Sequence, residues 1–232
     1  NMTNLQKRII TSIILLFFVI IFNFTKLFVI GVLIVIGWIC IEFSEMFTKL
    51  AGGGLIKSHP KDSFAEKFNF KYWALQLPTI FYMLVIFGGA AYELHGRSGS
   101  PVFFLYVLSI CFLSDIGGYS IGKLIGGKKL TKISPNKTIS GTIGSFSFSI
   151  LTPILFYNFD QNEYSLSINN FLFCLLVSLV CQLGDLFISY IKRKARIKDT
   201  GGIFPGHGGF LDRADGIIFA VPFALLSKFI IL

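Results

Sequence analysis

The chain alternates between long apolar runs and short polar stretches. Seven of these runs approach the roughly 20 residues that a helix needs to cross a hydrocarbon core about 30 Å thick. They cover residues 9–24, 27–47, 72–92, 101–121, 139–158, 169–191 and 214–232, and the first run is the shortest. The pattern predicts an all-α, polytopic membrane helix bundle with about seven transmembrane helices, and a count of six to nine spans fits the same runs.

Composition agrees with a membrane protein. Hydrophobic residues make up 53% of the chain and charged residues 14%, whereas a soluble domain has about 25% charged residues. All four cysteines lie inside apolar runs without the spacing of zinc ligands, so we expect neither a disulfide framework nor structural zinc. Lys7 and Arg8 precede the first run as in a signal peptide, but no small-residue cleavage site follows, so we expect a retained span. We expect one integral membrane domain over residues 1–232.

Basic residues are distributed unevenly over the segments between the runs. If the N-terminus lies inside, 18 of the 21 Lys and Arg residues fall on the cytoplasmic side, and only Lys26, Arg97 and Lys228 fall outside. Cytoplasmic loops of membrane proteins carry such an excess. We therefore expect a bacterial inner-membrane protein with its active site on the cytoplasmic side. The basic residues lie at the ends of spans, which favours the lipid bilayer and phosphates as partners and speaks against nucleic acid.

Five acidic residues lie at or just inside the predicted cytoplasmic ends of the spans: Glu42, Asp115, Asp185, Asp212 and Asp215. An acid at the centre of a spanning helix costs on the order of 2.5–3.5 kcal/mol on insertion scales, and less near the interface. Such residues usually form pairs, line a wet cavity or hold a cation. Internal salt bridges and side chains that reach for the interface are the alternative.

The spacing of three of these acids predicts a magnesium site. Asp212 and Asp215 are three apart, so on a helix they would project from one face. Gln182, Asp185 and Ser189 stand at steps of three and four and form a polar stripe on the preceding span. Carboxylates from two helices that meet at one point suit magnesium, which prefers oxygen ligands and keeps positions open for substrate phosphates.

The segment between these acids, 198–209, contains five glycines. Glycines let the backbone approach a phosphate closely, and neighbouring basic residues neutralise it. A tight turn with a hydrogen-bonded His207 is the alternative. The candidate substrate-binding residues around this segment are Lys192, Arg193, Lys198, His207 and Arg213.

A second candidate region follows the fourth predicted span. Gly118, Gly122 and Gly126 repeat every four residues with Asp115 on the same face, which favours tight helix packing. Asp115 itself is a candidate substrate-binding residue, as are Ser134 and Thr138. Residues 134–138 then place Ser134, Lys137 and Thr138 at the start of the fifth span, where unpaired helix N–H groups attract an anion. Residues 117–123 also read GxxxxGK, but Leu124 replaces the magnesium-binding hydroxyl and no strand precedes them, so we expect no P-loop.

Several motifs at fixed spacing resemble the signature of one enzyme family. They are Gly184-Asp185-Leu186, Lys192-Arg193, Lys198-Asp199, Pro205-Gly206-His207-Gly208-Gly209 and Asp212-Arg213-Ala214-Asp215. Together they resemble the phosphatidate cytidylyltransferases, also called CDP-diacylglycerol synthases. Residues 115–141 resemble a second region of that family, with an acid, a GK pair and an SPxKT motif. The resemblance covers the second half of the chain, and we expect the catalytic half at about 110–232.

The resemblance implies transfer of CMP from CTP to phosphatidate, with magnesium and a monovalent cation such as K⁺ as ions. It implies Asp185, Asp212 and Asp215 as metal ligands and catalytic residues, with Lys137 as a catalytic cation and Ser134 at the substrate phosphate. A homodimer is left open. This chain departs from the family in having Ser140 where Glu is usual and Gly216 where Ser is frequent.

Two other functions fit parts of the pattern. A related lipid kinase acting on a polyprenol would share the membrane bundle and release CDP instead of pyrophosphate. An ion-coupled transporter would place its acids near the bilayer midplane and would have broken helices in two matching halves. The acids of this chain cluster at the cytoplasmic level and no matching halves are visible, so the enzyme is the favoured interpretation.

Overall fold

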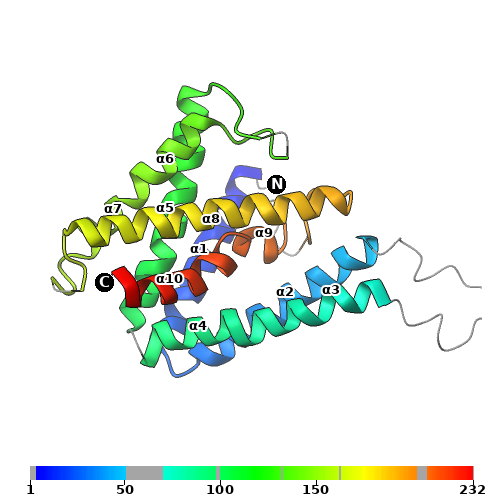
Figure 1. Cartoon of the computed structure of the whole chain (residues 1–232), viewed down its shortest axis with the longest axis horizontal. Helices are drawn as coiled ribbons and strands as arrows, with labels where there is room; N and C mark the ends of the chain where they lie inside the picture. The colour runs from blue at the N-terminus through cyan, green and yellow to red at the C-terminus, as the bar shows by residue number, and fades with distance from the viewer. Residues whose placement is uncertain are drawn as a thin grey trace, which may run out of the picture. The chain divides into compact units, whose positions relative to one another are not determined.

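The computed structural model describes residues 4–50, 70–97, 100–131, 133–161, 163–202 and 208–231, and these fold almost entirely into helices (Figure 1). In this part of the chain there is no β-strand, only an isolated bridge between Lys129 and Thr138. The helices are α1 (Asn4–Phe24), α2 (Phe28–Leu50), α3 (Phe70–Phe81), η1 (Tyr82–Phe87), α4 (Gly88–Tyr92), η2 (Glu93–Arg97), α5 (Pro101–Ile125), α6 (Ile139–Ser149), α7 (Leu151–Phe156), α8 (Ile168–Lys194), α9 (Leu211–Ala214) and α10 (Ile217–Ile231). Residues 51–69, between the second and third predicted spans, lie outside the described residues.

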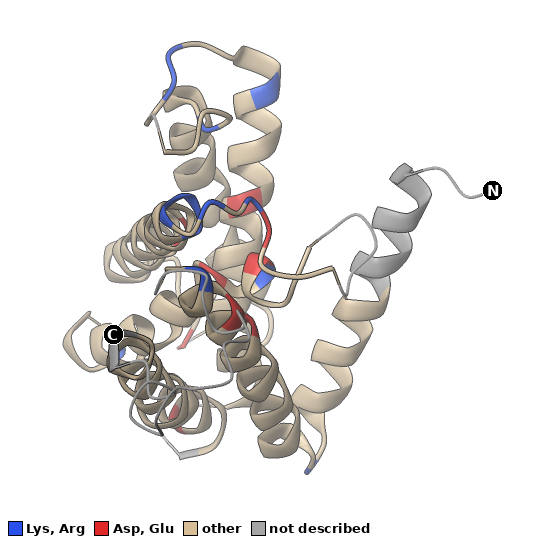
Figure 2. Ribbon diagram, turned by 90° about the vertical axis from the view of Figure 1, so that its right-hand side faces the viewer, with Lys and Arg blue, Asp and Glu red and all other residues tan. Residues whose placement is uncertain are grey.

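Six helical stretches are long and apolar enough to cross a membrane: Phe28–Leu50, Tyr72–Gly96, Pro101–Ile125, Ile139–Phe156, Ile168–Lys194 and Leu211–Ile231. They confirm the last six predicted spans. Figure 2 shows long uncharged stretches along these helices. The first predicted span lies in α1. Among the described residues, its apolar part Ile14–Phe24 is shorter than a membrane span, so a first crossing by α1 stays a prediction. The protein is an integral membrane protein.

The second of these stretches is not a uniform α-helix. The π-helical segments η1 and η2 interrupt it, and Pro78 lies inside α3. Proline has no N–H for the helix ladder, and π-helical turns are rare and short. The apolar pattern predicts a span here but does not predict these interruptions.

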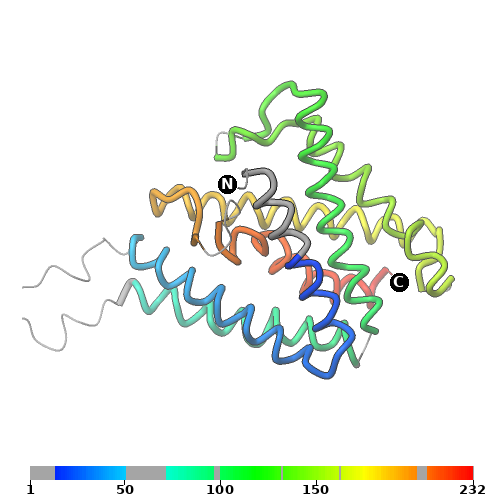
Figure 3. The backbone as a smooth tube through the Cα atoms, turned by 180° about the vertical axis from the view of Figure 1, so that it is seen from behind, coloured from blue at the N-terminus to red at the C-terminus, as the bar shows by residue number. Residues whose placement is uncertain are grey.

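The described chain forms two compact units, and it passes from one to the other after residues 88, 190 and 213. The first unit comprises residues 1–88 and 191–213. In it α2 and α3 lie side by side (Figures 1 and 3). The Ser44 and Tyr72 hydroxyls are 2.7 Å apart, and the Gln76 amide donates to the Cys40 carbonyl at 3.3 Å. Polar side chains thus join the two apolar helices on their facing sides.

The second unit comprises residues 89–190 and 214–232, and α5 and α6 make its closest helix contact. A Cβ on Gly118 would lie 2.6 Å from the Ser145 hydroxyl oxygen, and one on Gly122 would lie 3.0 Å from that of Thr138. This confirms the packing interpretation for Gly118 and Gly122. Gly126 instead ends α5 with φ +64°. Residues 117–123 are helical, which excludes a P-loop there.

Buried polar pairs also join α5 to α8 in the second unit. The Tyr106 hydroxyl donates to the Asn170 side-chain oxygen at 2.6 Å, and the Ser114 and Ser178 hydroxyls are 2.8 Å apart. On α10, the Lys228 ammonium lies 3.0 Å from Glu163. Satisfied buried polar groups fix the register of the helices, because an unpaired one is costly in apolar surroundings.

Candidate active site

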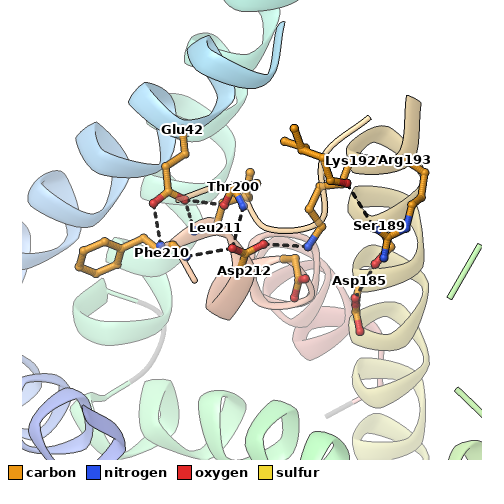
Figure 4. A network of polar contacts seen from close by, with 12 residues as sticks. Glu42, Asp185, Ser189, Lys192, Arg193, Thr200, Phe210, Leu211 and Asp212 are labelled. Atoms are coloured by element: carbon orange, nitrogen blue, oxygen red, sulfur yellow. Dashed lines mark hydrogen bonds and ion pairs between the residues drawn. The ribbon is translucent and has the colours of Figure 1, made fainter. Parts of the chain in front are cut away.

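In the first unit, Asp212 is the acceptor for three donors. It lies in the first turn of α9, and Lys192 lies in the last turn of α8. The Lys192 ammonium donates to Asp212 Oδ1 at 3.0 Å, and the two side chains are only 9% and 7% exposed. Asp212 Oδ2 accepts the backbone N–H groups of Thr200 at 2.8 Å and Gly209 at 2.9 Å (Figure 4). A carboxylate has about four lone-pair sites, so these donors use most of its capacity.

Glu42, from the middle of the apolar helix α2, accepts from the same segment. Its Oε1 accepts the N–H of Phe210 at 2.9 Å, and its Oε2 accepts the N–H of Leu211 and the hydroxyl of Thr200, both at 2.8 Å (Figure 4). The sequence singled out Glu42 as an intramembrane acid. The sequence gave no role to Thr200. The one feature that could have pointed to it is that it directly follows the Lys198-Asp199 motif.

Glycines of this segment bring the backbone against the two acids. Gly208 has φ +80°, and a Cβ there would lie 2.5 Å from Asp212 Oδ2. A Cβ on Gly201 would lie 2.8 Å from Glu42 Oε1, and Gly209 also lies against Glu42. These glycines therefore let the chain's own carboxylates approach the backbone. Contact with a substrate phosphate stays a prediction, and His207 lies outside the described residues.

The other predicted basic residues of the first unit are exposed. Arg193, Lys198 and Arg213 are all on the surface. Arg193 donates from Nη1 to the Ile197 carbonyl at 3.1 Å, which holds its side chain along the end of α8. The side chains of Arg193, Lys198 and Arg213 are thus open to solvent, whereas Lys192 is buried against Asp212.

In the second unit, Asp185 is held by two partners. The Lys137 ammonium forms an ion pair with Asp185 Oδ2, and the Ser189 hydroxyl donates to Oδ1 at 3.2 Å (Figure 4). Both side chains of the ion pair are partly exposed. The predicted polar stripe is confirmed for Asp185 and Ser189, whereas Gln182 donates to Ser178 at 3.3 Å. The structure thus brings together two predicted catalytic residues, Lys137 and Asp185.

Asp215 lies in a turn and not on the helix of Asp212. Helix α9 ends at Ala214, so the expectation that Asp212 and Asp215 share one helical face is wrong. Asp215 Oδ1 accepts the N–H of Gly216 at 3.0 Å, and a Cβ on Gly184 would lie 3.1 Å from the Asp215 carbonyl oxygen. Asp215 is therefore packed against α8 beside Asp185.

Two further features surround this part of α8. A Cβ on Gly216 would lie 2.5 Å from the Cys181 sulfur and 2.6 Å from its carbonyl oxygen, so the packing explains glycine at this position. Asp115 is exposed on α5. Three of the predicted acids, Asp115, Asp185 and Asp215, thus come from separate segments of this unit.

The segment before α6 folds as a small closed loop. Thr138 caps α6 and accepts the N–H of Gly141 at 3.1 Å, while the N–H of Leu130 donates to the Lys137 carbonyl at 2.8 Å. The Ser140 hydroxyl donates to the carbonyl of Gly126. Ser140 therefore closes the loop onto the end of α5. Substrate contacts of Ser134 and Thr138 stay predictions.

The acids fit part of a magnesium site. Within the described ranges, no group of three or more His, Cys, Asp and Glu side chains is close enough to hold a metal ion. Asp185 and Asp215 provide oxygen donors from adjacent segments of one unit, which suits a hard cation. Asp212 is bonded to its three donors in the other unit. The structure thus supports two of the three predicted ligands as neighbours.

Comparison with known proteins supports the resemblance seen in the motifs. Residues 6–230 match the cytidylyltransferase family. The proteins named Phosphatidate cytidylyltransferase from Staphylococcus haemolyticus (strain JCSC1435), Staphylococcus aureus (strain COL) and Staphylococcus epidermidis (strain ATCC 12228 / FDA PCI 1200) are each 39% identical to this chain over 161 residues. These matches cover 68% of this chain and 59% of each relative's length. Because the family match extends over nearly the whole sequence, the chain belongs to the cytidylyltransferase family.

Proposed function

We propose that the protein transfers CMP from CTP to phosphatidate, giving CDP-diacylglycerol and pyrophosphate. The observation that carries this proposal is the family match over residues 6–230, together with 39% identity to bacterial relatives named Phosphatidate cytidylyltransferase. The apolar spans supply the bilayer contact that a lipid substrate requires. The proposal therefore accounts both for the membrane spans and for the acidic and basic residues at their ends, which a reaction between two phosphate groups requires.

The reaction needs positioning more than covalent chemistry from the protein. An oxygen of the phosphatidate phosphate attacks the α-phosphorus of CTP and forms a new P–O bond. The bond from the α-phosphorus to the bridging oxygen breaks, and pyrophosphate leaves with that electron pair. A phosphate monoester is already ionised near neutral pH, with a second pKa of about 6, so no general base is required. Catalysis then depends on charge neutralisation and in-line alignment of two anions.

Asp185 and Asp215 are the proposed oxygen ligands for magnesium. Bound magnesium would neutralise charge on the triphosphate of CTP. Lys137, which is paired with Asp185, would move its ammonium to the substrate phosphate when that carboxylate turns to a cation. Asp212 as a third ligand and a monovalent cation such as K⁺ stay predictions from the family resemblance.

The basic residues have two proposed roles. Arg193, Lys198 and Arg213 are exposed and can contact the phosphates of CTP or phosphatidate. Lys192 is buried against Asp212 and fixes that carboxylate. This division changes the expectation for Lys192, because an ammonium already bonded at 3.0 Å has less capacity for substrate.

The active site is proposed to face the cytoplasm from a bacterial inner membrane. Two observations support this, namely the excess of Lys and Arg on one predicted side and the bacterial relatives. A homodimer stays a prediction from the sequence.

An assay of the purified chain in phosphatidate-containing micelles tests the function. With CTP and magnesium we expect equimolar CDP-diacylglycerol and pyrophosphate. The variant Asp185→Asn should lose at least about a hundredfold in turnover, the scale seen when a metal site loses a ligand or its support. Glu45→Gln is the matched control, because Glu45 is exposed on α2. Release of CDP would indicate a lipid kinase instead, and wild-type turnover in Asp185→Asn would remove Asp185 from the site.

A further inference from the structure

Glu42 is a buried carboxylate that is held by donors from a distant segment. Its side chain lies on an apolar helix and the residue is only 3% exposed. Its three described hydrogen-bond partners are two backbone N–H groups and one hydroxyl, all from residues 200–211. A buried charge is costly unless hydrogen bonds compensate it, and bonds to charged groups are the stronger ones. The positions of Glu42 and of Thr200, Phe210 and Leu211 therefore depend on each other.

Thr200 links Glu42 to Asp212. Its N–H donates to Asp212 Oδ2 at 2.8 Å, and its hydroxyl donates to Glu42 Oε2 at 2.8 Å (Figure 4). The residue is 5% exposed. One residue thus satisfies an oxygen on each of two acids, and any displacement of Thr200 changes the donors on both.

The far end of the segment is fixed by the same two carboxylates. Gly209 donates to Asp212, while Phe210 and Leu211 donate to Glu42. The Phe210 ring packs against Trp38 with centroids 6.0 Å apart. Both ends of the segment 200–211 are therefore bound to two acids, and one of these acids belongs to the family motif of the proposed reaction.

We infer that Glu42 and Thr200 are positioning residues that fix the backbone at residues 200 and 209–211 and thereby orient the carboxylate of Asp212. The link to catalysis rests on the proposed function. Glu42 does not contact substrate in this inference. It acts through Thr200, Phe210 and Leu211, and so its loss should alter the segment first and the turnover as a consequence.

Hydrogen–deuterium exchange of the intact protein in detergent micelles tests these backbone hydrogen bonds without substrate. In Glu42→Gln an amide group replaces one acceptor oxygen, and the N–H groups of Phe210 and Leu211 lose a charged partner. We expect the peptide containing residues 208–212 to exchange at least about tenfold faster, which corresponds to losing roughly one hydrogen bond to a charged group. Glu45→Gln, with the same charge change on the exposed side of α2, should leave that peptide unchanged.

Thr200 variants keep the test independent of how well Glu42→Gln folds. Thr200→Val removes only the hydroxyl and should speed exchange in the same peptide, whereas Thr200→Ser keeps the hydroxyl and should restore protection. In the CTP and phosphatidate assay, Glu42→Gln and Thr200→Val should lower kcat at least about tenfold with a smaller change in the KM for CTP, and Thr200→Ser should retain kcat. The split between kcat and KM separates positioning of Asp212 from loss of substrate binding.

The outcomes separate this inference from the proposed function. Unchanged exchange in both Glu42→Gln and Thr200→Val would overturn the inference, whatever the activity. Faster exchange with unchanged kcat would overturn the positioning role and leave only a structural one. If the variants show the expected exchange differences but the wild-type protein consumes no CTP, the proposed function is overturned and the hydrogen bonds of Glu42 and Thr200 still stand.

Discussion

Replacing Lys192 with Met tests the buried ion pair most sharply. Met keeps most of the aliphatic volume and removes the ammonium, which lies 3.0 Å from Asp212 Oδ1. Removing one partner of a buried pair typically costs about 3–5 kcal/mol, because the other charge is left uncompensated. Asp212 keeps its two backbone donors, Thr200 and Gly209, so we expect the lower end, about 3 kcal/mol.

A double-mutant cycle isolates the interaction itself. The variants Lys192→Met, Asp212→Asn and the combination of both would be unfolded by SDS titration in mixed micelles. The double variant leaves no isolated charge, so we expect a coupling free energy of about 2 kcal/mol, beyond the additivity limit of about 0.5 kcal/mol for independent sites. Lys198→Met is the charge-matched control on an exposed side chain and should not shift the midpoint. Additive effects within that limit would refute the buried pair.

Three further predictions concern packing, loop closure and metal. Gly216→Ala should lower the free energy of unfolding by about 1–3 kcal/mol, since its Cβ would lie 2.5 Å from the Cys181 sulfur, and SDS titration measures this. Ser140→Ala should lower it by about 1 kcal/mol through loss of the bond to the Gly126 carbonyl, in the same titration. Removal of divalent cations with EDTA should abolish CMP transfer and added magnesium should restore it, and activity that survives EDTA would contradict the metal proposal.

Much of the fold could be predicted because a helix that crosses a lipid bilayer needs a long run of apolar residues, and such runs are easily seen in a sequence. The runs that cover α2, α5 and α8 are apolar over the length of a membrane span. The spacing of Asp185 and Ser189 predicted that they share one polar stripe, and in the helix the Ser189 hydroxyl donates to Asp185 at 3.2 Å. Local periodicity is sufficient for such features, since helical neighbours at i and i+4 face each other in any sequence.

The rest depends on contacts between segments that are distant along the chain. Glu42 and Thr200 are 158 positions apart, and no local rule pairs them. The turn at Asp215 also follows from packing, because Gly184 and Gly216 admit the backbone against α8 at that point. The sequence therefore singled out Glu42 as an intramembrane acid, but it could not assign Glu42 to hydrogen bonds with Thr200, Phe210 and Leu211.

The destination of each CTP phosphorus tests the central claim most directly. Purified protein would be given phosphatidate, magnesium and CTP labelled either at the α-phosphorus or at the γ-phosphorus, and the lipid fraction would be counted. The account predicts that α-label enters the lipid as CDP-diacylglycerol and that γ-label leaves as pyrophosphate. Transfer of γ-label to the lipid, or no label in the lipid from either nucleotide, would contradict it.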